Sequence, residues 1–269
     1  MERTDWPDLS DQVRAAITER TGPVLAARTA DDGKNSAIAL LLETAQAGSV
    51  FVKGLRLDHP GVVTQHREAV INPYVRRLAP PLLWQTEIDG WNLLGFQRVP
   101  GRHADYRPGS PDVPRVVAAM ERLAQLRCPE LGALKRAERR WAMFLDDKND
   151  LSLLAGSTLL HTDYNPYNVL IEGDRAYLID WAWPTLGAAH VDPACLVVRL
   201  IAAGHTPEQA EEQVADIPAW RDASGRAIDV VVVALARMWA QIAAADPVGW
   251  KKRIAQGAAD WVSYRRVSL

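Results

Sequence analysis

The chain has few cysteines. It has two in 269 residues, Cys128 and Cys195, far apart and without a Cys-x-x-Cys pair. A disulfide-stapled fold or a structural zinc site needs several thiols at short spacing, so the sequence argues against both. Two isolated thiols are typical of proteins in a reducing compartment, and we therefore expect this protein in the cytoplasm.

An excess of basic charge is also missing, as is a long apolar run. The 31 Lys and Arg side chains are outnumbered by 33 Asp and Glu, for a net charge of −2. Nucleic-acid-binding domains usually carry a strong basic excess or patch, so we expect no nucleic-acid partner. The longest aliphatic run, residues 230–236, is too short to cross a membrane, and the N-terminal residues have no apolar signal region. We therefore expect no membrane partner either.

What remains is the composition of an ordinary globular chain. Hydrophobic residues make up 48% of it and charged residues 24%, which is enough apolar content for a true core. The length suits one two-lobed enzyme or two modest domains.

Lysine is scarce, and Lys53 has an unusual position. It lies inside residues 49–55, an apolar run of the kind found in β-strands. A charged group in such a strand is costly unless it has a partner. The helix predicted next, over residues 61–77 after His59 and Pro60, has one acid in its interior, Glu68. We predict a Lys53–Glu68 ion pair; the alternative is that Glu68 lies on a solvated helix face.

The most informative segment starts at Leu159 and reads LLHTDYNPYNVLIEGDRAYLIDW. Its pattern is strand, loop, strand, turn, strand, with the turn at residues 172–175. Asn168 precedes one strand and Asp180 ends the next, so an antiparallel hairpin brings both to the same end. For Asp163 alone the alternative would be an ordinary loop of turn residues.

The spacing of His161, Asp163 and Asn168 as H-x-D-x-x-x-x-N, followed by Asp180, resembles the phosphoryl-transfer core of kinases. The form HTDYNPYN is closest to the loop of the aminoglycoside phosphotransferase and choline kinase family. A hydroxyl is a poor nucleophile, and Mg²⁺ prefers oxygen ligands. The resemblance implies that Asp163 orients and deprotonates an acceptor hydroxyl, that Asn168 and Asp180 hold Mg²⁺, and that His161 supports the loop.

The resemblance also implies a nucleotide site in the first part of the chain. Lys53, as the third-strand lysine, would hold the phosphates of ATP with support from Glu68. Backbone amides of the loop between the first two strands would contact phosphate, with Gly33, Asn35 and Ser36 as candidates; the alternative is an ordinary hairpin turn. The hinge after the last strand would read the purine edge, with Gln97, Arg98 and Val99 as its segment. ATP is the expected nucleotide, and GTP is possible.

The expected fold is α+β, a two-lobed protein-kinase-like fold. An N-terminal nucleotide-binding lobe, residues 1–99, would have a small antiparallel sheet and one main helix, and a helical lobe, residues 100–269, would carry the catalytic loop and the acceptor site. The patterns predict strands over residues 23–29, 37–44, 49–55, 82–88 and 91–99. They predict further helices over residues 113–126, 131–145, 191–203, 208–214, 227–244 and 250–264. Asp192 is expected to cap a helix or support the catalytic loop.

Two aromatic residues bear on the acceptor. Trp181 and Trp183 directly follow Asp180, so they are candidates for the wall of the acceptor site; the alternative is core packing. Acids and bases are balanced after Asp180, which does not favour the acid-lined pocket that a polycation would need.

We expect a Mg²⁺-dependent small-molecule O-phosphotransferase, of the antibiotic-inactivating kind, acting on a nucleoside antibiotic, a macrolide or an aminoglycoside. The first alternative is a metabolic kinase for choline, homoserine, a sugar or a nucleoside. The second is a catalytically inactive kinase-like binding module. Partners would be a nucleotide and a hydroxylated small molecule, and the chain would be a monomer or a homodimer.

Overall fold

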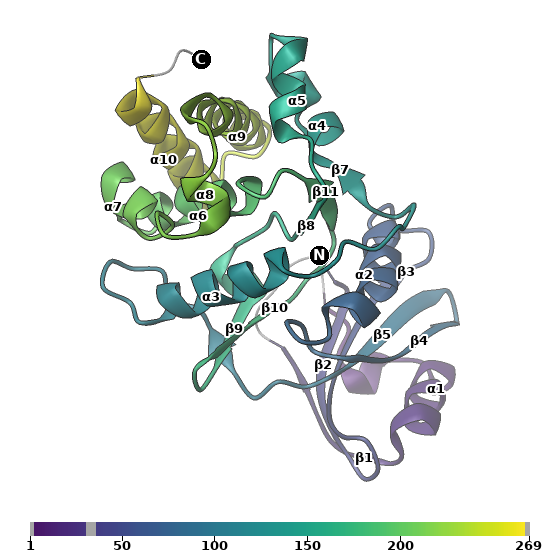
Figure 1. The fold of residues 1–269 in the computed structure, drawn as a ribbon. Coiled ribbons are helices and arrows are strands. Elements are labelled where there is room, and N and C mark those ends of the chain that lie inside the picture. The colour runs from purple at the N-terminus through teal and green to yellow at the C-terminus, as the bar shows by residue number, and fades with distance from the viewer. Residues whose placement is uncertain (1–2, 31–35, 267–269) are drawn as a thin grey trace. The chain divides into compact units, whose positions relative to one another are not determined.

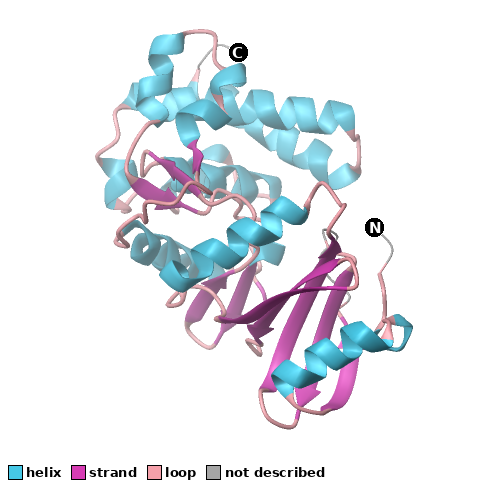
Figure 2. Ribbon diagram, turned by 90° about the vertical axis from the view of Figure 1, so that its right-hand side faces the viewer, coloured by secondary structure: helices cyan, strands magenta, loops and turns pink. Residues whose placement is uncertain are grey.

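A computed structural model of the chain describes residues 3–30 and 36–266. Its contacts divide it into two compact units. The first consists of Met1–Gly101 together with Leu178–Ala182, and the second of Arg102–Tyr177 together with Trp183–Leu269. The predicted α+β class is confirmed, with an antiparallel sheet in the first unit and mostly helices in the second (Figures 1 and 2).

The first unit is built on one antiparallel five-stranded sheet. Its strands, in the spatial order β1-β2-β3-β5-β4, are β1 (Val24–Thr29), β2 (Ile38–Thr44), β3 (Gly48–Arg56), β5 (Trp91–Gln97) and β4 (Leu82–Ile88). The β4–β5 hairpin turns at Asp89 and Gly90, with φ values of 49° and 75°. A tight hairpin turn of this type needs positive φ at both positions, which explains the predictive value of the Asp-Gly pair.

Helices pack on both faces of this sheet. Val13 and Ile17 of α1 (Asp11–Thr21) join a core cluster with Val50 and Val52 of β3. Because side chains alternate along a strand, Lys53 points to the opposite face. There Ala69 of α2 (Val62–Val75) joins a second cluster with Leu94 and Phe96 of β5. The α1 helix was not predicted, although Ser10 caps it by accepting a hydrogen bond from the Val13 amide.

The second unit contains two small sheets that hold the loop around Asp163. One has the order β10-β9-β6, formed by β10 (Arg175–Leu178), β9 (Val169–Glu172) and β6 (Arg102–His103). The other has the order β7-β11-β8, formed by β7 (Lys135–Arg136), β11 (Thr185–Gly187) and β8 (Thr158–Leu160). Gly173, with φ 55°, turns the predicted β9–β10 hairpin.

Helices make up most of the rest of this unit. They are α3 (Asp112–Ala124), α4 (Ala137–Arg140), α5 (Leu151–Leu154), α6 (Val191–Ala202), α7 (Pro207–Glu212), α8 (Pro218–Arg221), α9 (Gly225–Ala245) and α10 (Gly249–Arg265). The α10 helix packs closely on α6, since a Cβ added at Gly257 would lie 3.0 Å from the Ile201 side chain. This close approach leaves little room for a side chain at position 257.

The prediction of one helix over residues 131–145 was wrong. Only α4 and a short 3₁₀ turn, Ala142–Phe144, are helical there. Lys135 and Arg136 instead pair in parallel with Thr185 and Leu186 of β11. A tertiary strand pairing therefore overrides the helical spacing of the apolar residues.

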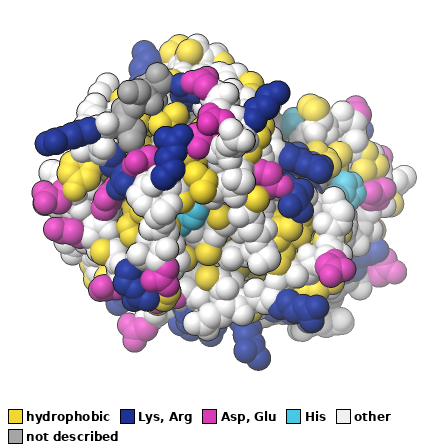
Figure 3. All heavy atoms as spheres, turned by 45° about the horizontal axis from the view of Figure 1, so that its top comes forward, with side chains coloured by type: hydrophobic (Ala, Val, Ile, Leu, Met, Phe, Trp, Pro, Cys, Tyr) yellow, Lys and Arg dark blue, Asp and Glu magenta, His cyan; other side chains and the backbone are white. Residues whose placement is uncertain are grey.

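Within residues 3–30 and 36–266, one helix is long and apolar enough to cross a membrane, judged by length and composition alone: α9. The core helices of soluble proteins pass the same test, and 44% of its most apolar window is buried inside the protein. On the face that Figure 3 shows, basic and acidic side chains are interspersed.

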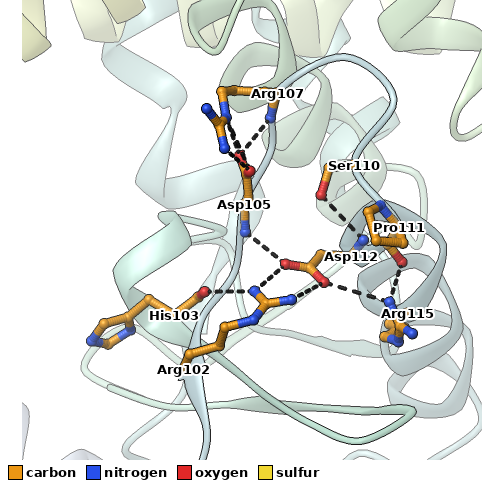
Figure 4. A network of polar contacts seen from close by, with 8 residues as sticks. All are labelled: Arg102, His103, Asp105, Arg107, Ser110, Pro111, Asp112 and Arg115. Carbon is orange, nitrogen blue, oxygen red and sulfur yellow. Dashed lines mark hydrogen bonds and ion pairs between the residues drawn. The ribbon is translucent and has the colours of Figure 1, made fainter.

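A polar network joins β6 to the start of α3 (Figure 4). The guanidinium of Arg102 donates to both carboxylate oxygens of Asp112, at 2.5 and 2.8 Å. The Asp105 amide donates to the same carboxylate at 2.9 Å. The Arg102 hydrogen bonds hold the pKa of Asp112 below its usual value. The network thus fixes the beginning of the second unit to its first long helix.

Candidate functional site

The first unit contains a buried cluster of one cation and two carboxylates. Lys53 of β3 is 8% exposed and forms an ion pair with Glu68 of α2, which is 5% exposed. The Lys53 Nζ atom also lies 3.2 Å from Oδ1 of Asp180 and 5.9 Å from the centroid of the Phe96 ring. The structure therefore contains the predicted Lys53–Glu68 pair and adds Asp180 to it.

The carboxylates decide the charge of this lysine. Burial alone would lower the pKa of Lys53, but the negative charges of Glu68 and Asp180 outweigh that effect and raise it well above its ordinary value. Lys53 therefore remains an ammonium at any physiological pH. A cation held in this way is suited to bind the phosphates of a nucleotide.

Asp180 is held in an unusual backbone conformation. Its φ is 60°, in the left-handed region, and its carbonyl oxygen accepts a hydrogen bond from the Ala182 amide at 2.8 Å. Its side chain is 27% exposed and one oxygen contacts Lys53. The carboxylate therefore retains accessible oxygen surface, which a metal ligand needs.

Three of the predicted nucleotide contacts fall on the loop before β2. Gly33 and Asn35 lie outside the described residues, and Ser36 is a half-buried residue just ahead of the strand. Their predicted contact with phosphate stays a prediction.

The predicted hinge segment, residues 97–99, is partly hydrogen-bonded to the backbone of the first unit. The Gln97 amide donates to the Pro81 carbonyl at 2.9 Å, and the Arg98 amide donates to the Ser49 carbonyl at 3.1 Å. Both amides are therefore bonded within the sheet in this conformation, while Val99 lies beyond the end of β5. The predicted contact of residues 97–99 with a purine stays a prediction.

In the second unit, Asp163 lies in the loop between β8 and β9 with both carboxylate oxygens bonded. Oδ1 accepts from Nη2 of Arg199 at 2.8 Å, and Oδ2 accepts from Nδ2 of Asn168 at 2.9 Å. The Asp163 side chain is 33% exposed. The carboxylate is therefore held in a fixed direction and is still open to solvent, as a group that must receive a proton from a bound hydroxyl requires.

The contact with Asp163 also orients Asn168. A carboxylate only accepts hydrogen bonds, so the amide nitrogen of Asn168 must face it, and the same nitrogen lies 3.3 Å from the Asp163 carbonyl. The amide oxygen of Asn168 then points away from the Asp163 carboxylate and can bind a cation. The described residues include no cluster of three or more His, Cys, Asp or Glu that would hold a metal by themselves. An amide oxygen is nevertheless a ligand type that Mg²⁺ accepts, because the ion usually takes few protein ligands and completes its shell with phosphate and water.

Arg199 is the functional candidate that the sequence analysis missed. It belongs to α6, its side chain is 9% exposed, and its guanidinium carbon lies 4.7 Å from the centroid of the Trp239 ring on α9. A cation in the middle of the apolar run from Leu196 to Ile201 was a usable signal, of the same kind that indicated Lys53.

Buried polar groups hold the loop around Asp163 in place. The Asp192 carboxylate accepts hydrogen bonds from the amides of His161 and Thr162, at 3.0 and 2.9 Å, and from the Tyr164 hydroxyl at 2.9 Å. Asp192 thus has the predicted supporting role and not the cap, because His190 is the N-cap residue of α6. His161 is buried, and its Nδ1 lies 3.3 Å from the Asp163 amide, which is a structural position.

The two tryptophans after Asp180 differ. Trp181 is 2% exposed, and its indole N–H donates to the Leu178 carbonyl at 3.0 Å. It is a packing residue, so the expectation that it lines an acceptor site was wrong. Trp183 is 41% exposed, with Lys135 and Arg140 over its ring at 5.6 and 5.3 Å. Its contact with an acceptor stays a prediction.

Solved structures with the same fold exist. Choline kinase LicA from Streptococcus pneumoniae is 14% identical, with 94% of this chain and 98% of that chain covered and a TM-score of 0.62. LicA in complex with AMP is 12% identical over 94% of this chain and 97% of that chain, with a TM-score of 0.60. A thermostable mutant of aminoglycoside phosphotransferase APH(4)-Ia, in a ternary complex with ADP and hygromycin B, is 15% identical over 94% of this chain and 98% of that chain, with a TM-score of 0.59.

A comparison with curated protein sequences found no match. A family model does match, over residues 90–227, which include the loop around Asp163, the β9–β10 hairpin, Asp180 and Arg199. The match covers more than half of the chain and agrees with the fold. The protein belongs to the phosphotransferase enzyme family.

Proposed function

We propose that this chain transfers the γ-phosphoryl group of ATP to a hydroxyl of a small molecule, in a reaction that depends on Mg²⁺. The observation that supports this most is the geometry of Asp163, whose two oxygens are bonded to Arg199 and Asn168 while the side chain is one-third exposed. A carboxylate fixed in this way can orient a hydroxyl and accept its proton as the phosphoryl group arrives.

The other residues divide the remaining work. Lys53, kept charged by Glu68 and Asp180, binds the nucleotide phosphates. Asp180 and Asn168 offer oxygens to Mg²⁺, which when bound neutralises charge on the phosphates. Structures of neighbours with ADP or AMP support a nucleotide substrate. GTP remains the alternative, because the hinge segment would read the purine with backbone groups.

For the acceptor we propose an antibiotic-type alcohol, with a metabolic alcohol such as choline, homoserine, a sugar or a nucleoside as the alternative. Trp183 supports a flat or partly apolar acceptor, since it is exposed and its carbonyl accepts from the hydroxyl of Thr162, the residue before Asp163. We further propose that the protein acts in the cytoplasm, in line with its two free cysteines.

The test is mass-spectrometric detection of phosphate transfer from Mg·ATP, with Mg·GTP in parallel. The acceptor panel would hold aminoglycosides, nucleoside antibiotics, macrolides and small metabolic alcohols. The Asp163→Asn variant is the test protein, and Asp222→Asn, at an exposed surface acid, is the matched control.

A product formed by the wild type and the control, but not by Asp163→Asn, would support the proposal and name the acceptor class. Equal product from Asp163→Asn would overturn the role of Asp163. Nucleotide binding without any product from the whole panel would favour the inactive binding module instead.

A further inference from the structure

Thr162, next to Asp163, has a backbone conformation that its side chain disfavours. Its φ is 66°, in the left-handed region, and the residue is 8% exposed. Threonine is β-branched, so its Cβ substituents crowd the backbone there, whereas glycine adopts this region freely. Holding a threonine in this region costs free energy, which surrounding contacts must offset.

Two sets of contacts hold Thr162 in place. Its amide donates to Oδ1 of Asp192 at 2.9 Å, and its hydroxyl oxygen accepts from Nη1 of Arg140 at 2.5 Å. The hydroxyl also faces the Trp183 carbonyl at 3.4 Å. The backbone contact is one that a glycine would make as well, but the contact with Arg140 needs the threonine side chain.

Arg140 is itself fixed from several sides. The same Nη1 donates to the hydroxyl of Thr185 at 3.0 Å, and that hydroxyl lies 2.8 Å from the Trp183 carbonyl. The guanidinium carbon lies 4.8 Å from the centroid of the Trp141 ring, and Trp141 is fully buried. A planar cation over an aromatic face has little freedom to move. Arg140 therefore links the end of α4, the strand β11 and the loop around Asp163.

We propose that Arg140 is a positioning residue for Asp163, acting through the hydroxyl of Thr162. It would hold Thr162 at its strained φ and so fix the direction in which the next residue, Asp163, presents its carboxylate. The inference rests on the proposed function, in which that direction decides the rate of phosphoryl transfer.

The test uses four proteins: the wild type, Arg140→Met, Thr162→Gly and the double variant. Arg140→Met keeps most of the side-chain volume but removes the donor. We expect it to lower the transfer rate at saturating substrate about tenfold or more, with nucleotide affinity unchanged, because small displacements of a base cost large factors in rate. Glycine at 162 adopts the required φ without help, so in that background the same change should cost less than about threefold.

The control is Arg139→Met, the exposed neighbour on α4, which should change neither rate nor affinity. Urea unfolding of all four proteins checks that each is folded at the assay temperature. If Arg140→Met lowers the rate by the same factor in both backgrounds, or lowers stability alone, the positioning role is overturned. A wild type that transfers to no acceptor would instead overturn the proposed function, and this role with it.

Discussion

Nη2 of Arg199 lies 2.8 Å from Oδ1 of Asp163, so a helix far along the chain supplies the counter-ion of the proposed base. Arg199→Met should lower the transfer rate about tenfold to a hundredfold, because Asp163 then keeps only its contact with Asn168. We also expect a loss of about 1–2 kcal/mol in the free energy of unfolding, modest because the Asp163 side chain is one-third exposed.

A double-mutant cycle isolates this pair. Once Asp163→Asn has removed the negative charge, Arg199→Met should cost clearly less stability than it does in the wild type. The control is Arg221→Met, whose ion pair with Asp222 is exposed. Strictly additive free energies of unfolding would contradict the pairing.

The Lys53–Glu68 pair should govern nucleotide affinity. Lys53→Met removes the cation, and we expect about a tenfold or larger rise in the Kd for ATP by isothermal titration calorimetry. Glu68→Gln keeps the shape but leaves Lys53 with Asp180 as its anionic partner, so a smaller rise of about threefold to tenfold should follow. Glu19→Gln on the exposed face of α1 should leave the Kd unchanged. An unaltered Kd in Lys53→Met would refute the assignment.

The two proposed magnesium ligands should respond differently to substitution. Asp180→Asn should raise the Mg²⁺ concentration needed for half-maximal rate about tenfold or more, since it removes a charged ligand. Asn168→Asp adds a charged ligand but places a second carboxylate against Asp163, where Asn168 now donates a hydrogen bond. We expect its maximal rate to fall below that of Asn168→Ala, because like charges in contact disturb the base. The reverse order in a Mg²⁺ titration of both variants would show that Asn168 acts on the metal alone.

The pH dependence of stability should contain a contribution from His190. This residue is 6% exposed, and burial lowers its pKa below the ordinary 6.5. The unfolded chain therefore takes up a proton at a higher pH than the folded chain does. The free energy of unfolding should thus fall as the pH drops through 6.5. Below the folded-state pKa of His190, this contribution to the free energy of unfolding no longer changes.

His190→Gln removes this titration. Urea unfolding at pH 8, 7, 6 and 5 should show a wild type that loses stability relative to the variant as the pH falls. At pH 8 the histidine is neutral in both states, so the difference measured there is the reference. A difference between the two proteins that stays constant over the whole range would contradict the prediction.

Local patterns predicted the parts of the site that lie on regular strands. The lysine inside the apolar run of β3 predicted its ion pair with α2, and the turn residues 172–175 predicted the β9–β10 hairpin. Arg199 was missed because it follows Asp163 by 36 residues, on a later helix, and no local motif links the two positions. The error for Trp181 has another cause: adjacency to Asp180 does not determine in which direction a side chain points.

The segment 178–182 belongs by its contacts to the first unit, yet the chain enters it from the second unit and returns to it. A fragment ending at residue 101 would therefore lack Asp180, one of the two carboxylates around Lys53. Neither unit is one contiguous stretch of chain, so neither can be exchanged for that of a relative as a single fragment. A chimaera that takes a new nucleotide-binding part from a relative would have to graft two separate stretches, the short one in the middle of the recipient.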